Sequence, residues 1–349
     1  MVIGNIVVRV RSVCAACLRD FRHSWPVILL AMLMTILLAA AATVQSFHVD
    51  IVDLAPLYVA IIIFLASGLY ILRRTPSGNA AMAAREGSGQ RLGHILVLTG
   101  LFYFMAATAA LGCAALARTA LPYADTMLAA ADRALYFDWL AMMAWFQASP
   151  RIATLLIHAY AAINWQPQLA ILLLCGLGHP ALAYRFMTAW GMCLLLTIVM
   201  FPFFPAVAAF HHYNVDPAQM PGATAWASWH LEALMEELRS GAKATLDSDA
   251  LTGIITMPSF HAASAILLIF AFWPFPWLRW PFLLLNMVMF ASAVPVGGHY
   301  LVDTLGGLML ALIAIGTSIA VHGRGEDIRL DWKTIGHQVR RREAGLASA

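Results

Sequence analysis

Long apolar runs alternate with short polar segments along most of the chain. Each run approaches or exceeds the length at which a helix crosses a bilayer, about 20 residues. Because lipid cannot satisfy unpaired backbone groups, every run is predicted to be helical. The runs are Trp25–Phe47, Leu54–Leu72, Leu92–Ala117, Ile152–Leu177, Phe186–Ala209, Leu251–Trp273, Trp280–Val296 and Tyr300–Val321. The pattern predicts an all-α integral membrane protein with about eight transmembrane helices.

Composition supports the membrane class. Hydrophobic residues make up 62% of the 349 residues and charged residues 11%, with a mean hydropathy of +0.77. A soluble globular protein is far less apolar. The net charge of +3 is too small to indicate nucleic acid as a partner. Cys14 and Cys17 form a lone C-x-x-C without a second ligand pair, so we expect reduced thiols and neither a metal nor another cofactor.

Basic residues fall between alternate runs, which the positive-inside rule assigns to one common side. Both termini are therefore expected to be cytoplasmic in a bacterial-type inner membrane. The first run follows several arginines and could imitate a signal peptide, but its length favours a retained helix. The basic residues are Arg9, Arg11, Arg19, Arg22, Arg73, Arg74, Arg85, Arg91, Arg185, Arg279, Arg324, Arg329, Lys333, Arg340, Arg341 and Arg342.

The opposite side carries acidic and aromatic segments. Residues 134–146, A-L-Y-F-D-W-L-A-M-M-A-W-F, are too few to span and predict a helix in the outer interface, with tryptophans at headgroup depth. The sequence W-H-L-E-A-L-M-E-E-L-R at 229–239 repeats apolar residues at helical spacing. It predicts a second short amphipathic helix over the outer face.

Two histidine motifs stand where a polar turn gives way to an apolar run. They are M-P-S-F-H-A-A-S at 257–264 and G-G-H-Y-L-V-D at 297–303. Counting spans from a cytoplasmic N-terminus places His261 in the outer third of the sixth span and His299 at the outer end of the seventh. Asp303 begins the return inward. We therefore expect these three side chains to meet at one depth on the outer side.

The residue types in these motifs favour phosphoryl transfer through a phosphohistidine, with no metal required. Asp303 follows His299 by four residues, the spacing that puts two side chains on one helical face. A carboxylate bound to one imidazole nitrogen leaves the other free as a nucleophile. His261 could then protonate the leaving group. Ser259 and the first-turn N–H groups beside Gly298 would offer hydrogen-bond donors to an anion.

The motifs P-S-F-H and G-H-Y-L-V-D resemble the second and third motifs of the type 2 phosphatidic acid phosphatase (PAP2) superfamily, P-S-G-H and S-R-x5-H-x3-D. They are most similar to the branch that includes inositol phosphorylceramide synthase and its bacterial relatives. The resemblance implies that His299 is the nucleophile, Asp303 its orienting partner and His261 the general acid. It also implies that Ser259 and Ser292 bind phosphate.

The resemblance covers roughly the last six spans and divides the chain into three regions. Residues 1–91 are expected to form a cytoplasmic N-terminus and two additional transmembrane helices. Residues 92–321 would form a PAP2-like six-helix catalytic core. Residues 322–349 would form a basic cytoplasmic tail.

Two basic positions of the family pattern are missing. Ala293 stands where the third motif has arginine, and no K-x6-R-P pattern precedes Pro258. Another cation is therefore expected to hold the phosphate charge. Arg239 and Lys243 are the nearest candidates, although they could equally be solvated charges on an amphipathic helix; His211 and His212 are others.

These features predict a membrane phosphatase or phosphotransferase acting on a lipid phosphate or phospholipid at the outer face. Water as acceptor would make the protein a phosphatase, whereas a lipid or polyol hydroxyl would make it a transferase similar to inositol phosphorylceramide synthase. The motifs do not separate these, because both share the first half-reaction. A hypothesis of another class is a non-catalytic lipid-binding or transport protein with a PAP2-like fold, which the missing basic residues motivate.

Overall fold

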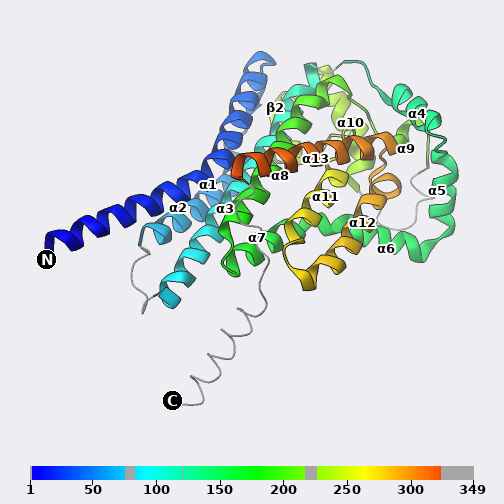
Figure 1. Ribbon diagram of the computed structural model, residues 1–349. Helices are drawn as coiled ribbons and strands as arrows, with labels where there is room; N and C mark the ends of the chain where they lie inside the picture. Colours follow the sequence, from blue (N-terminus) through cyan, green and yellow to red (C-terminus); the bar gives the residue numbers. More distant parts are fainter. Residues whose placement is uncertain (1, 75–82, 120, 217–225, 324–349) are drawn as a thin grey trace.

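The computed structural model describes residues 2–74, 83–119, 121–216 and 226–323, and almost all of them are helical. The basic tail beyond residue 323 and the side chains of Cys14 and Cys17 lie outside this description. The elements, labelled as in Figure 1, are α1 (Val2–Val44), β1 (His48–Val49), α2 (Ile51–Arg74), α3 (Ala83–Leu116), η1 (Ala117–Thr119), α4 (Asp125–Ala134), α5 (Trp139–Ala148), α6 (Pro150–Ala161), η2 (Ala162–Asn164), α7 (Gln166–Gly176), α8 (Pro180–Met200), η3 (Phe201–Phe203), α9 (Ala209–His212), α10 (Trp226–Ser240), β2 (Thr245–Leu246), η5 (Ser248–Leu251), α11 (Phe260–Phe272), α12 (Pro276–Gly297) and α13 (Leu301–His322).

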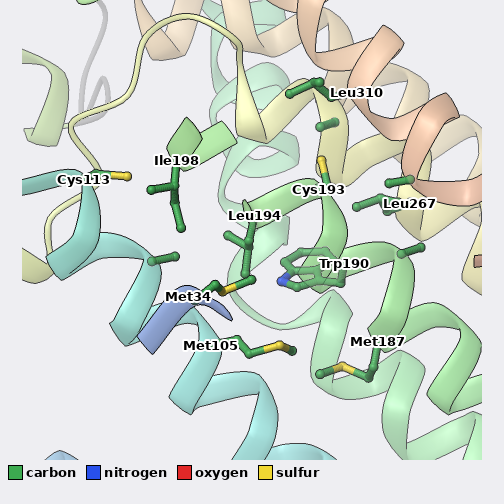
Figure 2. Close-up of a cluster of buried hydrophobic side chains, with 14 of the residues drawn as sticks. Met34, Met105, Cys113, Met187, Trp190, Cys193, Leu194, Ile198, Leu267 and Leu310 are labelled. Atoms are coloured by element: carbon green, nitrogen blue, oxygen red, sulfur yellow. The ribbon is translucent and has the colours of Figure 1, made fainter. Parts of the chain in front are cut away.

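Helix α8 lies at the centre of the bundle. It packs against α1, α3, α11 and α13 and is apolar on nearly every face, as expected for a helix that has neighbours on most sides. Figure 2 shows its core, in which large and flexible side chains from five helices interdigitate around Trp190. The labelled side chains are Met34, Met105, Cys113, Met187, Trp190, Cys193, Leu194, Ile198, Leu267 and Leu310.

The described residues contain six helices long and apolar enough to cross a membrane. The bent pair formed by α5 with the α6 and η2 segment raises the number to seven if it counts as one span. The all-α membrane class is therefore confirmed, whereas the predicted count of eight is not. The six are His23–Val44, Ile51–Arg74, Gly87–Leu116, Pro180–Phe203, Pro276–Gly297 and Leu301–His322.

Two predicted spans are not continuous helices. The run Ile152–Leu177 is divided into α6 and α7, because the ring of Pro167 would clash with the carbonyl group four residues earlier in an unbroken helix. The run Leu251–Trp273 is helical only from Phe260 onward, since Pro258 has the same effect and Ser259 then begins α11. His261 is consequently the second residue of a helix rather than one embedded deep within it.

Both predicted short amphipathic segments are helical. Asp138 begins α5 by accepting a hydrogen bond from the N–H of Ala141 at 3.0 Å. On α10 the buried side chains include Leu231, Met235 and Leu238, which recur at helical spacing. Trp139 differs from the prediction, because it is only 1% exposed and packs inside the protein rather than at headgroup depth.

The turn that follows α1 is attached to the segment that precedes α11. Strands β1 and β2 pair in parallel, with His48 opposite Thr245. The N–H of Ser248 donates to Oδ2 of Asp53 at 2.6 Å. The N-terminal pair of helices is thus joined to the loop that precedes α11.

Arg118 reinforces the same junction. Its guanidinium group lies over the ring of Phe47, with 4.0 Å between Cζ and the ring centroid. It also donates to the carbonyl oxygens of Gln45 at 2.7 Å, Leu238 at 3.0 Å and Lys243 at 2.9 Å. One arginine therefore connects α1, α10 and the segment before β2.

Polar side chains within the bundle form hydrogen bonds between helices, as they commonly do in membrane proteins. Asn286 of α12 donates to Oε1 of Gln166 of α7 at 2.9 Å. Thr99 of α3 donates to Oε1 of Gln168 at 3.2 Å. These contacts tie α7 to its two neighbours.

Candidate active site

The two histidine motifs lie side by side. Ser259 begins α11, and His299 occupies the turn between α12 and α13. The backbone N–H of Ser259 donates to the carbonyl oxygen of Asp303 at 3.0 Å, which joins the start of α11 to the first turn of α13. Motifs that are far apart in the chain therefore share one corner of the bundle.

His299 and Asp303 form a buried pair. Nδ1 of His299 lies 3.4 Å from Oδ2 of Asp303, and the side chains are 6% and 0% exposed. This distance is longer than a well-formed N–H···O hydrogen bond of about 2.7–3.2 Å. Oδ2 of Asp303 also accepts the N–H of Tyr300 at 2.9 Å. The carboxylate is thus held in place against the Nδ1 edge of the imidazole.

His261 has a different partner. Its Nδ1 lies 3.2 Å from the hydroxyl oxygen of Tyr160 on α6. The two rings are also stacked, with their centroids 4.0 Å apart and an interplanar angle of 9°. A tyrosine therefore fixes the plane of this imidazole.

Both histidines line one cavity of about 510 Å³. Its walls come mainly from α3, α6, α8 and the segment 253–256, and most of the lining is apolar. Tyr160, Asn164, Thr197 and Thr256 contribute polar groups. Among the lining residues in the described part of the chain, none is lysine or arginine. The cavity thus pairs two imidazoles with a surface suited to a hydrocarbon chain.

The turn that carries His299 is held from two neighbouring helices. Asp132 of α4 accepts the N–H groups of Leu301 and Val302, both at 2.9 Å, one with each carboxylate oxygen. Trp139 of α5 donates its indole N–H to the carbonyl oxygen of His299 at 3.1 Å. Asp132 therefore acts as a bidentate cap on the start of α13.

Tyr300 and Gly298 attach the same turn to the segment around α9. The hydroxyl of Tyr300 donates to Oδ1 of Asp125 at 2.9 Å, and Oδ2 of Asp125 accepts the N–H of Val207 at 3.1 Å. The N–H of Ala209 donates to the carbonyl oxygen of Gly298 at 2.8 Å. Every residue from Gly298 to Val302 is consequently hydrogen-bonded to another element or to Asp303.

The comparison with protein families decides the classification. Residues 126–317, more than half of the 349 residues and inclusive of both histidine motifs, match the model described as PAP2 superfamily. The chain belongs to the PAP2 superfamily. Comparisons with curated proteins and with solved structures gave no match. Membership of the PAP2 superfamily supports a phosphatase or phosphotransferase type of function in general.

Three predicted phosphate-binding residues of this PAP2 protein lie outside the cavity lining. Ser259 caps α11, since its Oγ accepts the N–H of Ala262 at 3.3 Å. The hydroxyl of Ser292 donates to the carbonyl oxygen of Met289 at 2.7 Å. Gly298 has a φ of +68°, which favours glycine, and its carbonyl oxygen accepts the N–H of Ala209, while the N–H of His299 closes the end of α12 on the carbonyl oxygen of Ala293. Each therefore has a structural partner.

The first-turn N–H groups of α11 and α13 differ in availability. Those of Leu301 and Val302 on α13 are occupied by Asp132. Those of Phe260 and His261 belong to the first turn of α11, which has no earlier turn to bond to. Phe260 and His261 also line the cavity. Of these two first turns, only that of α11 could therefore offer backbone N–H donors to an anion in the cavity.

The two basic candidates are engaged elsewhere. Arg239 lies over the ring of Tyr123 and donates to the carbonyl oxygen of Leu121 at 3.2 Å. Nζ of Lys243 lies 2.8 Å from a carboxylate oxygen of Asp247. Neither residue lines the cavity.

The two histidine candidates also lie outside the lining. Nδ1 of His211 lies 2.9 Å from a carboxylate oxygen of Glu232. The ring of His212 lies edge-on to that of Tyr300, at 6.1 Å between centroids. Neither histidine therefore faces the cavity that His261 and His299 line.

Sequence reasoning missed the residues that hold the two histidines. Asp132 is 169 residues from Leu301, and Tyr160 is 101 residues from His261. No role was predicted for Asp132 or Tyr160. The single available signal was the presence of aspartates in an otherwise apolar and aromatic stretch, since buried carboxylates need partners.

Burial raises the pKa of Asp125 and Asp132 above the usual value near 3.8. The N–H of Val207 opposes the effect on Asp125, and those of Val302 and Leu301 oppose it on Asp132. Burial together with Asp125 also raises the pKa of the Tyr300 phenol. The phenol thus remains a hydrogen-bond donor to Asp125 at neutral pH.

Proposed function

We propose that this PAP2 protein transfers a phosphoryl group from a lipid phosphate or phospholipid through a covalent intermediate on His299. The observation that carries the proposal is that His299 and His261 line one cavity, with Asp303 against His299. A nucleophile, its orienting carboxylate and a separate acid are the groups that such a transfer needs. The family match supports the general type of reaction.

In the first step Nε2 of His299 attacks phosphorus, because Nδ1 faces the carboxylate of Asp303. The N–P bond forms while the P–O bond to the leaving group breaks. His261 in its protonated form gives a proton to the departing oxygen. In the second step water or an acceptor hydroxyl attacks phosphorus, His261 takes the proton of that nucleophile, and the N–P bond breaks.

The phosphoryl group would be held by the start of α11 and by protonated His261. The N–H groups of Phe260 and His261 are placed where the helix dipole favours an anion. Ser259 stabilises this site indirectly, because its Oγ caps the first turn of α11 by accepting the N–H of Ala262. We leave Arg239, Lys243, Ser292 and Gly298 out of the proposed phosphate contacts, because none of them lines the cavity.

The apolar walls support a lipid substrate. Ala109, Leu194 and Ile198 belong to the lining contributed by α3 and α8, helices that are long enough to cross the membrane. A hydrocarbon chain against this surface would leave the phosphate at the two histidines. The chain's burial would contribute roughly 0.8 kcal/mol per CH₂ group.

We also propose that the site faces the outer side, with both termini cytoplasmic. His23 at the start of the first span stacks on His322 at the end of the last, with ring centroids 6.0 Å apart. This contact supports placing both ends of the membrane region on one side. His299 follows the end of α12, and the distribution of arginines assigns the opposite end to the cytoplasm.

The test is phosphate release by purified protein in vesicles that contain lipid phosphates or phospholipids. We expect release by the wild type and by His158→Ala, because His158 is exposed on α6 and does not line the cavity. We expect none above background from His299→Ala. Equal release by the wild type and His299→Ala would contradict the proposal. Adding inositol, diacylglycerol or ceramide then separates the acceptors, because a new phospholipid indicates transfer and phosphate alone indicates hydrolysis.

A second candidate is a non-catalytic lipid-binding protein. The observation that favours it is the lack of lysine and arginine among the described residues that line the cavity. This candidate predicts saturable binding of the same lipids with no turnover. It also predicts that His299→Ala binds them as the wild type does.

A further inference from the structure

Tyr160 lies between the two histidines. A side-chain carbon placed on Gly297 would lie 2.8 Å from Cδ2 of His299 and 2.9 Å from the hydroxyl oxygen of Tyr160. Both side chains therefore reach the space that the missing side chain of Gly297 leaves open. On its other side Tyr160 contacts His261, through both the 3.2 Å contact and the stacked rings.

The two contacts of Tyr160 with His261 restrict two properties of the imidazole, the orientation of its plane and the choice of the nitrogen that contacts the protein. Stacking at 4.0 Å and 9° fixes the plane of the ring. The hydroxyl contact selects Nδ1 as the nitrogen bound to the protein. Nε2 is then the nitrogen available to the reaction, because a hydrogen bond at one imidazole nitrogen determines the role of the other.

We infer that Tyr160 is a positioning residue for His261, whose hydroxyl oxygen accepts the Nδ1–H of His261 and thereby leaves the transferable proton on Nε2. The inference rests on the proposed function, in which His261 is the acid. Tyr160 keeps its own proton throughout. The proton on Nε2 goes to the leaving oxygen in the first step and is replaced from the acceptor in the second.

The choice of partner separates the roles of the two histidines. The carboxylate of Asp303 stabilises a positive charge on His299 as it attacks, which suits a nucleophile. A phenol is neutral at pH 7 and stabilises the imidazolium form of His261 less strongly. His261 therefore gives up its proton more readily than it would beside a carboxylate. Two residues of the same type acquire different chemistry from their neighbours.

Tyr160→Phe tests the inference because it keeps the ring and removes the hydroxyl. With an alkyl leaving group we expect kcat to fall about 10- to 100-fold, since a misplaced catalytic group costs a factor of this order. KM should change little. With a p-nitrophenyl leaving group, which departs without a proton, the first step of the variant, measured as the burst of p-nitrophenol, should approach the wild-type rate. Tyr123→Phe is the matched control, since Tyr123 packs under Arg239 and does not line the cavity.

An equal loss on both leaving groups would overturn the inference, because it would indicate a general defect of the site. An unchanged kcat on the alkyl substrate would overturn it as well. A wild type that turns over neither substrate would contradict the proposed function instead.

A spectroscopic measurement decides the role of Tyr160 without turnover. Nitrogen-15 NMR of histidine-labelled protein, with the His261 signals assigned by their loss in His261→Gln, reports which ring nitrogen carries the proton. We expect a protonated Nδ1 and a bare Nε2 in the neutral wild type, and a mixture of tautomers in Tyr160→Phe. Identical tautomer populations in both proteins would overturn the inference even if the enzyme proposal stood.

Discussion

The two histidines of the candidate site are held in different ways. The turn of His299 is hydrogen-bonded to Asp132, Trp139 and the segment around α9, and Asp303 lies against its imidazole. His261 is held by Tyr160 and projects from the first turn of α11 into the cavity wall. The position of the proposed nucleophile, His299, therefore depends on hydrogen bonds from several elements. The orientation of the proposed acid, His261, depends on one side chain, Tyr160.

The largest expected effects come from removing the histidines themselves. His299→Ala should abolish phosphoryl transfer with every leaving group, because no nucleophile remains. His261→Ala should lose about 10²- to 10⁴-fold with an alkyl leaving group, the usual contribution of general acid catalysis. Its first step should recover with a p-nitrophenyl leaving group, measured as the burst of p-nitrophenol. A p-nitrophenol burst from His299→Ala would contradict its role as the nucleophile. The absence of a burst from His261→Ala would contradict its role as the acid.

The next effect tests the rigid attachment of the His299 turn. In Asp132→Asn one carboxylate oxygen is replaced by a donor, so either Leu301 or Val302 loses its acceptor. We expect unfolding to be easier by about 1–3 kcal/mol, the cost of an unpaired buried group. Formation of the phosphoenzyme should also slow, as measured by rapid quench.

Asp138→Asn is the matched control for Asp132. Asp138 also caps a helix, accepting the N–H of Ala141, but it has no contact with the His299 turn. We expect it to cost less than about 0.5 kcal/mol, because asparagine caps a helix about as well as aspartate, and to leave the phosphorylation rate unchanged. Equal rate losses in both aspartate variants would show that helix stability, rather than attachment of the turn, governs the reaction.

The raised pKa of Asp132 predicts that the stability difference between the wild type and Asp132→Asn depends on pH. Because the folded state binds this proton more tightly, the contribution of Asp132 to stability falls as pH rises from about 3.8 through the raised pKa. The difference in unfolding temperature between the wild type and Asp132→Asn should therefore narrow over that range. A difference that widens with pH would mean that the hydrogen bonds to Leu301 and Val302 outweigh burial.

The sequence was sufficient for the local features of the site. Apolar runs located most of the helices, and the four-residue spacing from His299 predicted a nearby Asp303, whose Oδ2 lies 3.4 Å from Nδ1 of His299. The roles of both residues stay predictions. The pairing of His261 with Tyr160 and of Asp132 with the start of α13 could not be predicted, because these contacts join residues more than 100 positions apart. Their geometry depends on how α4 and α6 pack, and no local pattern encodes that packing.

Prolines explain why two of the predicted spans were too simple. Hydropathy does not distinguish an apolar helix from an apolar segment broken by Pro167 or Pro258, although both residues are visible in the sequence. Because proline disfavours the interior of a helix, the position of Pro258 predicts that α11 starts beside His261.

A smaller effect is expected at the junction of the N-terminal helices. Arg118→Gln removes donors to Gln45, Leu238 and Lys243, so unfolding should become easier by about 1–3 kcal/mol. We expect KM to rise more than kcat falls, because the attached segment leads into the cavity lining at Gly253. A thermal scan and steady-state kinetics measure both, and a loss confined to kcat would contradict this role.

The smallest effect is expected from Arg239→Gln. Arg239 stacks on an aromatic ring and donates to a backbone carbonyl group, as Arg118 does, but it neither lines the cavity nor joins the N-terminal helices. We expect kcat/KM to change less than about threefold. The corresponding free energy is smaller than the net contribution of a typical hydrogen bond, about 1 kcal/mol. Substrate affinity that weakens by two orders of magnitude in steady-state kinetics would restore Arg239 as a phosphate contact.

The most direct test of the central proposal is to trap the phosphoenzyme. The protein is mixed with a p-nitrophenyl lipid phosphate and quenched in denaturant at alkaline pH, where phosphohistidine survives, and the modified residue is located by peptide mass spectrometry. We predict one lipid-phosphoryl group, still esterified to its lipid, on His299, with a higher yield in His261→Ala because that variant lacks the base for the second step. Turnover without an adduct, or an adduct on His261, would contradict His299 as the nucleophile.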